Sequence, residues 1–333
     1  MRSQWLDILS YARWAPSPHN MQSWRFRLER DDSVTLLYDP ARLLPNTDPT
    51  GRFCTVGFGI LLETMSVAAA PLGYDVAVQF RTQVLDARAG KLTPLARLTL
   101  VPRDTIELLD RQLILDRRTS RLPYDDQPVP APVLEELSEV AAEYGHVFEY
   151  SVEPRQVDWV VRLNADTMFF DMSDPLSRNE VGGWIRFSQR DAKRRADGLA
   201  AYAMHFAGPL MWLFVHHNWL FRLPGVYQMV RAFYVRSMRG TRTAAWLSGP
   251  FEVHEDWIRA GRMMARLWLV MTKHGVYLHP FGSVITNPKA HALMAEHFAN
   301  PLRKHDLWML VRLGQSDLPP QAQRIELGDL IVK

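Results

Sequence analysis

The sequence is poor in the residues that cross-link a chain or hold a metal. Cys54 is the only cysteine among the 333 residues, which excludes an intrachain disulfide and makes a reducing compartment the simpler expectation. No HExxH segment or cysteine cluster occurs, and the adjacent His216 and His217 would point roughly 100 degrees apart on a helix. We therefore predict that the chain holds no metal.

The first residues do not fit a signal-peptide pattern, and the sequence has no concentrated block of charge. Asp7 and the absence of a continuous apolar run before Pro16 disfavour a signal peptide, so we expect a cytoplasmic protein. The net charge is +3 and the pI about 9.0. The basic residues are nevertheless spread along the chain and mixed with acids, and no zinc-finger or helix-turn-helix signature accompanies them. Nucleic-acid binding is therefore disfavoured.

What is present fits a folded protein with room for two domains. Hydrophobic residues make up 47% and charged residues 23% of the chain, which is ordinary for a globular protein. Apolar spacing and glycine or proline breaks predict helices near 5–12, 57–72, 109–115, 132–141 and 257–274, and strands near 34–38, 76–80 and 96–101. The helices at 57–72 and 257–274 are both long and apolar and both are followed by glycine. This faint similarity indicates two diverged copies of one unit.

Two segments carry the strongest functional signal. One is the proline-rich loop at 16–24, where Ser17 and Asn20 offer small polar side chains, and the other is the arginine segment at 116–121. A fork of guanidinium groups binds a phosphate monoester through charge-assisted hydrogen bonds, and small polar groups suit the edge of a flavin ring. Taken singly, the patterns also fit a loop that merely ends a helix and a solvated arginine cluster.

Together the two segments resemble the flavin mononucleotide (FMN) site of the nitroreductase superfamily. The run APSPHNMQSW resembles the family's APSxHNxQPW loop, with Ser23 in place of the usual proline, and RRTSR followed by LPYDDQPVP resembles its RRxxR segment and continuation. The segment 275–282 is similar to the family's GLxxxP segment, and 319–331 is similar to its closing PxxxxRRPLxxxI strand. Gln323 and Ile325 flank Arg324 where the family often has a second cation.

The resemblance implies a set of residues around one FMN. In the family, arginines grip the FMN phosphate, while the proline-rich loop and the GLxxxP segment surround the ring. The residues at these positions are Pro16, Ser17, Asn20, Gln22, Arg117, Arg118, Thr119, Arg121, Pro280, Phe281, Gly282 and Arg324. No catalytic side chain is identified by the resemblance.

The two segments stand in the reverse of the order found in an ordinary nitroreductase, where the arginines come first. This arrangement resembles the Acg-like branch, in which two nitroreductase units are fused. The resemblance therefore implies an α+β pseudo-dimer of two units, near residues 1–110 and 111–333, each a small mixed or antiparallel sheet wrapped by helices. We expect the helices at 57–72 and 257–274 to pack at its centre, and the chain to be a monomer or weak dimer with one flavin site.

The resemblance also implies an activity, FMN-dependent oxidation of NAD(P)H. Hydride would pass to flavin N5 and then to a small electron-deficient acceptor such as a nitroaromatic or a quinone, with nearby N–H groups or positive charge stabilising the reduced ring. The alternative is a flavin-binding or sequestering protein whose covered site admits no nicotinamide.

The segment 197–243 is the part least similar to the family. It is strongly apolar, yet polar residues interrupt it, and it is too short and broken to span a bilayer. Three interpretations stay open: a lid over the flavin with Met204, Met211, Trp212 and Trp219 on its covering face, a membrane-surface contact, or plain core.

Overall fold

The first part of the chain forms a four-stranded antiparallel sheet. The computed structural model describes residues 1–217, 219–220 and 223–333, so Asn218, Phe221 and Arg222 of the apolar segment lie outside the described residues. The elements are α1 (Arg2–Ala12), β1 (Trp24–Leu28), β2 (Val34–Tyr38), α2 (Arg52–Ala69), β3 (Tyr74–Phe80) and β4 (Thr93–Pro102). The strands lie in the order β1-β2-β4-β3, and every neighbouring pair is antiparallel.

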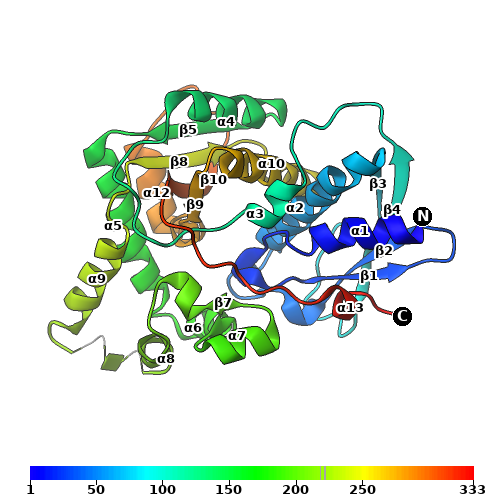
Figure 1. Ribbon diagram of the computed structural model, residues 1–333. Helices are drawn as coiled ribbons and strands as arrows, with labels where there is room; N and C mark the ends of the chain where they lie inside the picture. The colour runs from blue at the N-terminus through cyan, green and yellow to red at the C-terminus, as the bar shows by residue number, and fades with distance from the viewer. Residues whose placement is uncertain (218, 221–222) are drawn as a thin grey trace.

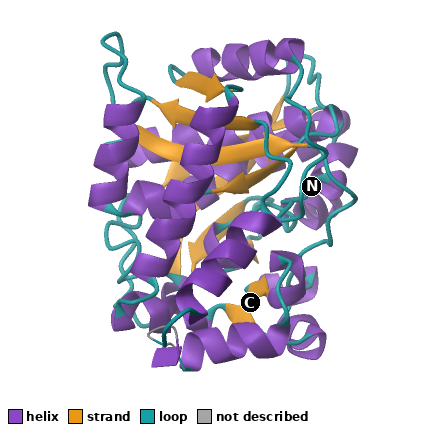
Figure 2. Cartoon of the chain, turned by 90° about the vertical axis from the view of Figure 1, so that its left-hand side faces the viewer, coloured by secondary structure: helices purple, strands orange, loops and turns teal. Residues whose placement is uncertain are grey.

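The second part repeats this arrangement. After α3 (Gln112–Asp116) come α4 (Ala131–Glu143), β5 (Val147–Ser151), β8 (Thr243–Ser248), α10 (His254–Lys273), β9 (Tyr277–Pro280), α11 (Gly282–Thr286), α12 (Pro288–His297) and β10 (Leu307–Gly314). The order β5-β8-β10-β9 matches the first sheet strand for strand, again with antiparallel neighbours. A long helix stands between the second and third strands in both sheets. The expected α+β pseudo-dimer is confirmed, and helices surround the strands (Figure 2).

The two long helices α2 and α10 pack against each other at the centre of the molecule (Figure 1). They cross where Gly59 faces Gly261: a Cβ atom on Gly59 would collide with the carbonyl oxygen of Ile258, and one on Gly261 with that of Val56. The contact is reciprocal, as a twofold relation requires. The seam between the units therefore depends on two glycines that let the helix backbones touch.

A large insertion separates β5 from β8. It contains α5 (Pro154–Asp171), α6 (Pro175–Gly183), β6 (Ile185–Arg186), α7 (Gln189–Arg195), β7 (Leu199–Ala200), α8 (Gly208–His216) and α9 (Val226–Ser237), with β6 and β7 forming a small parallel pair. In the first sheet the same connection is only the turn 29–33. The additional chain thus begins directly after β5, well before residue 197.

The C-terminal segment returns to the first unit. Val332 donates its N–H to the carbonyl of Phe26 on β1 at 2.8 Å, and Ile331 pairs with Phe26 in a single parallel bridge. Figure 1 shows this red segment running from the second unit to β1. The expected closing strand is wrong, because residues 327–330 form the short helix α13 (Leu327–Leu330) and only one bridge is made.

The predicted helices correspond to α1, α2, α3, α4 and α10, and the predicted strands to β2, β3 and β4. The sequence did not predict β1, the four strands of the second sheet, the helices of the insertion, α11 or α12. In β1 the inward residues Trp24 and Phe26 alternate with Arg25 and Arg27, but five residues after a loop are too few for this alternation to predict a strand.

The segment Arg52–Leu72 is long and apolar enough to span a membrane, yet 89% of its apolar window is buried inside the protein. This helix is the core of the pseudo-dimer.

Candidate functional site

A cavity of about 620 Å³ lies where the two units and the insertion meet, within the size range of small-molecule sites. Ten of the twelve predicted site residues line it: Pro16, Ser17, Asn20, Arg117, Arg118, Thr119, Arg121, Pro280, Gly282 and Arg324. Gln22 and Phe281 do not. Segments separated by up to three hundred residues thus converge on one space.

The loop after α1 is held in an unusual backbone conformation. His19, Asn20 and Gln22 have φ values of 47°, 54° and 52°, in the left-handed region that non-glycine residues rarely adopt. Gly57 on α2 lets this loop lie close, since a Cβ there would come within 3.2 Å of Pro18. Strain of this kind persists only when surrounding contacts fix it, and those contacts come from Gln22 and Asn20.

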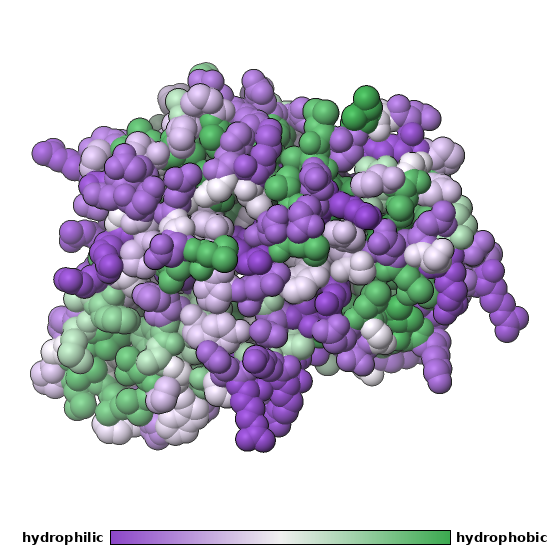
Figure 3. Space-filling view, in the orientation of Figure 1, coloured by the Kyte–Doolittle hydropathy of each residue, from purple (hydrophilic) through white to green (hydrophobic). Residues whose placement is uncertain are grey.

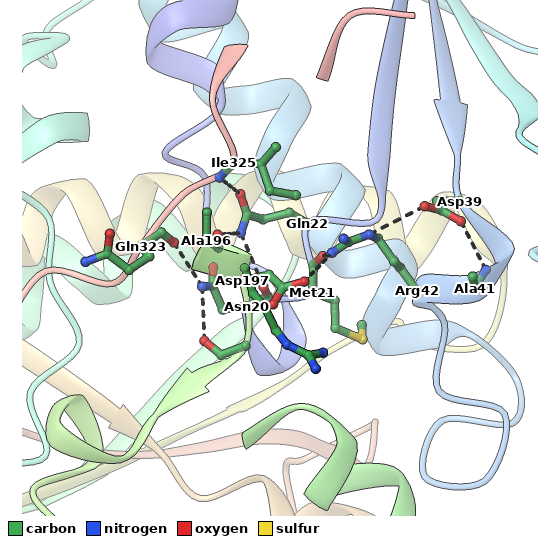
Figure 4. A network of polar contacts seen from close by, with 12 residues as sticks. Asn20, Met21, Gln22, Asp39, Ala41, Arg42, Ala196, Asp197, Gln323 and Ile325 are labelled. Atoms are coloured by element: carbon green, nitrogen blue, oxygen red, sulfur yellow. Dashed lines mark hydrogen bonds and ion pairs between the residues drawn. The ribbon is translucent and has the colours of Figure 1, made fainter. Parts of the chain in front are cut away.

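Gln22 ties the loop to two distant segments. Its amide nitrogen Nε2 donates to the carbonyl of Ala196 at 2.9 Å, and its Oε1 accepts the N–H of Ile325 at 2.9 Å (Figure 4). Gln22 is fully buried. It therefore acts by joining the first unit to the insertion and to the C-terminal segment, outside the cavity wall.

Asn20 holds Arg324. Its amide nitrogen donates to the carbonyls of Gly198 and Gln323 at 3.1 and 3.0 Å, and its Oδ1 accepts from Arg324 at 2.7 Å. The Asn20 side chain thus has no N–H group left to offer a ligand. The sequence predicted Asn20 at the edge of a flavin ring, whereas in the structure its side chain positions the Arg324 guanidinium.

Arg117 and Arg324 reach the same place from opposite ends of the second unit. Each donates to the carbonyl oxygen of Trp14 at 3.3 Å, and neither forms an ion pair with an acid among the described residues. Burial lowers the pKa of both groups, that of Arg324 to about 10, and each is lowered further by neighbouring arginines. Two buried like charges without a counter-ion are costly, so the arrangement favours binding of an anion.

The other predicted cations complete a positive cavity wall. Arg121 makes no hydrogen bond or ion pair with any described residue, and burial lowers its pKa. The segment is fixed because Thr119 bridges to Leu278 of β9 and Ser120 donates its N–H to the Leu278 carbonyl. Arg117 also lies 4.6 Å from the ring centre of Trp268 on α10, in cation–π range.

Among the described residues that line the cavity, three have a buried side-chain atom without a hydrogen-bond partner in the protein: His19 Nδ1, Asp48 Oδ1 and Arg324 Nε. Burial lowers the pKa of His19 to about 4, so its ring is neutral near pH 7. Beside Gly282 there is open space where a side chain would stand. Orphaned polar atoms are rare in native proteins, and these three mark a polar part of the wall that fits a ligand carrying polar atoms.

Of the four residues predicted to form the covering face of a lid, two line the cavity and two lie on the outer surface. Met204 and Met211 line the cavity together with Phe169, Phe206 and other apolar residues of the insertion. Trp212 and Trp219 instead lie on the outside, with 44% and 57% of their surfaces exposed. The insertion therefore covers the cavity through residues of several of its segments, and α8 contributes one side only.

Several wall residues were missed by sequence reasoning, notably Trp14, Trp268 and Asp197. Asp197 accepts two hydrogen bonds from Arg186 at Oδ1 and one from Arg42 at Oδ2, at 2.9 Å. The bond from Arg42 anchors the insertion to the first unit. Trp14 lies two residues before Pro16, and this closeness to the proline-rich loop was the one feature of the sequence that could have indicated it. The other two lie in segments without a recognisable motif.

The chain was compared with known proteins. No protein-family model matches it. It is 26% identical over 314 residues to PigM of Serratia sp., assigned by name as an NAD(P)H nitroreductase, covering 87% of this chain and 83% of PigM. It is 36% identical over 117 residues to Acg of Mycobacterium tuberculosis, also assigned by name as an NAD(P)H nitroreductase, covering 34% of each chain.

These relatives confirm the predicted resemblance to the nitroreductase superfamily. The similarity to Acg confirms the predicted resemblance to its Acg-like branch. Among solved structures, NfnB of Mycobacterium smegmatis, an FMN-dependent nitroreductase in complex with NADPH, is 16% identical with a TM-score of 0.39, covering 66% of this chain and 94% of NfnB. NfnB of Sphingopyxis sp. strain HMH, an FMN- and NADPH-dependent nitroreductase, is 14% identical with a TM-score of 0.40, covering 67% of this chain and 97% of NfnB.

Proposed function

We propose that this nitroreductase-family chain is an FMN-dependent NAD(P)H oxidoreductase that passes electrons to a small electron-deficient acceptor such as a nitroaromatic or a quinone. The observation that carries the proposal is that Arg117 and Arg324, from the two ends of the second unit, are buried at the cavity and have no acid partner among the described residues. The names of PigM and Acg as NAD(P)H nitroreductases support the same activity.

In this proposal the FMN phosphate lies between Arg117 and Arg324. A phosphate monoester carries nearly two negative charges at pH 7 and would supply the counter-charge that these guanidinium groups lack. Asn20 fixes the Arg324 side chain, and Trp268 supports that of Arg117. Arg118, Thr119 and Arg121 line the same cavity and complete the positive wall.

The rest of the cavity suits a flat, largely apolar ring. When bound, FMN would supply the hydride-accepting and electron-donating chemistry. Met264 and Trp268 of α10 and Ile60 of α2 offer apolar wall, and Ser17, His19 and the backbone near Gly282 offer polar groups. The insertion excludes water from this side. We assign no general acid, so the protein's part is binding, orientation and electrostatics.

One such site per chain is expected. Eleven residues of loop join α1 to β1, including Ser17 and Asn20, whereas only three residues join α4 to β5. The second unit therefore has no counterpart of the proline-rich loop. We further propose a unit boundary near residue 110, a cytoplasmic location and a monomer or weak dimer.

Binding of FMN to the purified apoprotein tests the phosphate assignment. Loss of one charge-assisted hydrogen-bonding group costs about 1.5–3 kcal/mol, so Arg324→Ala should weaken FMN binding roughly tenfold to a hundredfold. Riboflavin, which lacks the phosphate, should bind both proteins equally. Arg97→Ala removes an exposed arginine paired with Asp31 and serves as the control. Unchanged FMN affinity in Arg324→Ala would refute the assignment.

Rapid mixing of the FMN-loaded protein with NADH or NADPH tests the activity. Fast bleaching of the oxidised flavin spectrum, followed by recovery on adding a quinone or nitroaromatic, supports the oxidoreductase. A stable oxidised spectrum with both nicotinamides would contradict it and support a flavin-sequestering protein.

A further inference from the structure

The outer side of the insertion is apolar where a surface helix is normally polar. α8 contains the run Leu210–Val215, which is apolar on every side. Met211 and Phe214 of α8 face the cavity. The other large apolar side chains of this region are exposed, on α8, on the segment that leads to α9, and on α9 itself: Leu210, Trp212, Leu213, Trp219, Leu223, Met229 and Phe233. Figure 3 shows this group as the green area at lower left, over α8 and α9. We call these seven residues the outer patch.

A patch of this kind needs a partner. Single exposed apolar residues are normal, but a contiguous group of large ones marks a contact with a membrane or another protein. Two of the seven are tryptophans, the residue enriched where protein meets the membrane–water interface.

The charge around the outer patch indicates which partner. From Gly198 to Phe251 the sequence contains five arginines and not one aspartate or glutamate. Arg231 and Arg242 are paired with Asp166 and Asp126 from other segments. Arg236 and Arg239 are exposed and form no ion pair with any described residue. Lys193, on neighbouring α7, is exposed as well.

We propose that the outer patch is a contact surface for an anionic lipid bilayer. The seven apolar side chains would enter the boundary between headgroups and acyl chains, while Arg236 and Arg239 lie against lipid phosphates. The surface is a peripheral contact, because the exposed segments are short helices at the edge of the molecule (Figure 1). It does not depend on the proposed flavin chemistry.

The same helices also form the cavity wall. Met211 and Phe214 of α8, and Val230 and Tyr234 of α9, line the cavity from the side opposite to the outer patch. A bilayer on the outer patch would therefore lie one helix away from the proposed flavin. This favours a lipid-soluble acceptor, an apolar quinone in chemical class, and this part of the inference rests on the proposed function.

Sedimentation with vesicles tests the surface and needs no flavin. The full-length protein should sediment with vesicles of mixed phosphatidylglycerol and phosphatidylcholine, less so at high salt because screening weakens the arginine contacts, and not with phosphatidylcholine alone. The double variant Trp212→Ser/Leu213→Ser should bind at least about tenfold more weakly, since it removes much of the apolar area. Arg236→Glu/Arg239→Glu tests the charge without altering apolar packing.

The matched control is Ile106→Ser/Leu108→Ser. Ile106 and Leu108 are 88% and 89% exposed and lie in the loop after β4, outside the insertion. This variant should bind vesicles like the unmodified protein. Equal binding by all variants, or no binding by the unmodified protein, would overturn the proposal. So would a stable dimer in analytical ultracentrifugation that Trp212→Ser/Leu213→Ser dissociates, since a second copy would then cover the patch.

The rate of NADPH oxidation tests whether the acceptor is a lipid-soluble quinone. With a quinone carrying a long apolar tail in anionic vesicles, Trp212→Ser/Leu213→Ser should oxidise NADPH more slowly than the unmodified protein, while rates with a water-soluble quinone stay equal. Equal rates with both quinones would refute the lipid-soluble acceptor. No NADPH oxidation with either quinone, despite vesicle binding, would instead refute the proposed function and leave the surface standing.

Discussion

Substituting Gly261 by alanine should destabilise the protein, although alanine is the better helix former. In an open helix position, Gly→Ala gains about 1 kcal/mol. At Gly261, however, the new Cβ would collide with the carbonyl oxygen of Val56 and lie 2.8 Å from the Cα of Gly59 and 2.9 Å from the nitrogen of Ile60. All three atoms belong to the backbone of α2, so no side-chain rotation relieves the contact.

The expected magnitude follows from these opposing terms. Overpacking costs typically about 1–3 kcal/mol, and a contact with rigid backbone belongs at the upper end, near about 3 kcal/mol. Subtracting the helix-propensity gain of about 1 kcal/mol leaves a net loss of about 2 kcal/mol. Because α2 and α10 both line the cavity, through Gly57 and Trp268 among others, moving them apart should also weaken FMN binding.

Urea unfolding followed by circular dichroism measures the loss. The control is Gly183→Ala at the end of α6, where a Cβ would meet nothing within 4 Å. That variant should be as stable as the unmodified protein or up to about 1 kcal/mol more stable. If Gly261→Ala is equally stable or stabilised, the close crossing of α2 and α10 is wrong, and with it our account of how the units are joined.

Three further predictions concern the site and the seam. The pKa of Arg324 is lowered to about 10 by burial and by the charges of Arg118 and Arg13. Since only the protonated group attracts phosphate, FMN affinity should fall as pH rises through about 10, and it should fall further than the affinity for riboflavin, which has the same ring but no phosphate. Asn20→Ala removes the acceptor that positions Arg324 and should weaken FMN binding roughly tenfold, measured by fluorescence titration against Asn300→Ala, an exposed asparagine. Glu63→Gln removes a buried carboxylate that accepts hydrogen bonds from Arg262 and Arg266. Its free energy of unfolding, measured in urea, should fall by about 2 kcal/mol, less than the roughly 3–5 kcal/mol of a fully buried pair because both arginines are partly exposed. The control is Glu326→Gln, whose carboxylate is exposed and whose free energy of unfolding should fall by less than about 0.5 kcal/mol.

Local features of this protein could be predicted from its sequence because they depend on neighbours in the chain. Pro16 and Gly73 end helices through their own backbone properties, and the apolar spacing of α4 and α10 predicts both their extent and their buried faces. The motifs around Ser17, Arg117 and Arg324 named the segments that meet at the cavity.

What those residues do was decided only by tertiary structure. Asn20 positions Arg324 because Gly198 and Gln323 use its two N–H groups, and neither partner lies within 170 residues of it. The run Leu210–Val215 is apolar on every side, so hydropathy could not tell that Met211 faces the cavity while Trp212 faces outward. A sequence fixes a helix's local geometry, whereas its rotation about its axis and the partners of its side chains depend on contacts between distant segments.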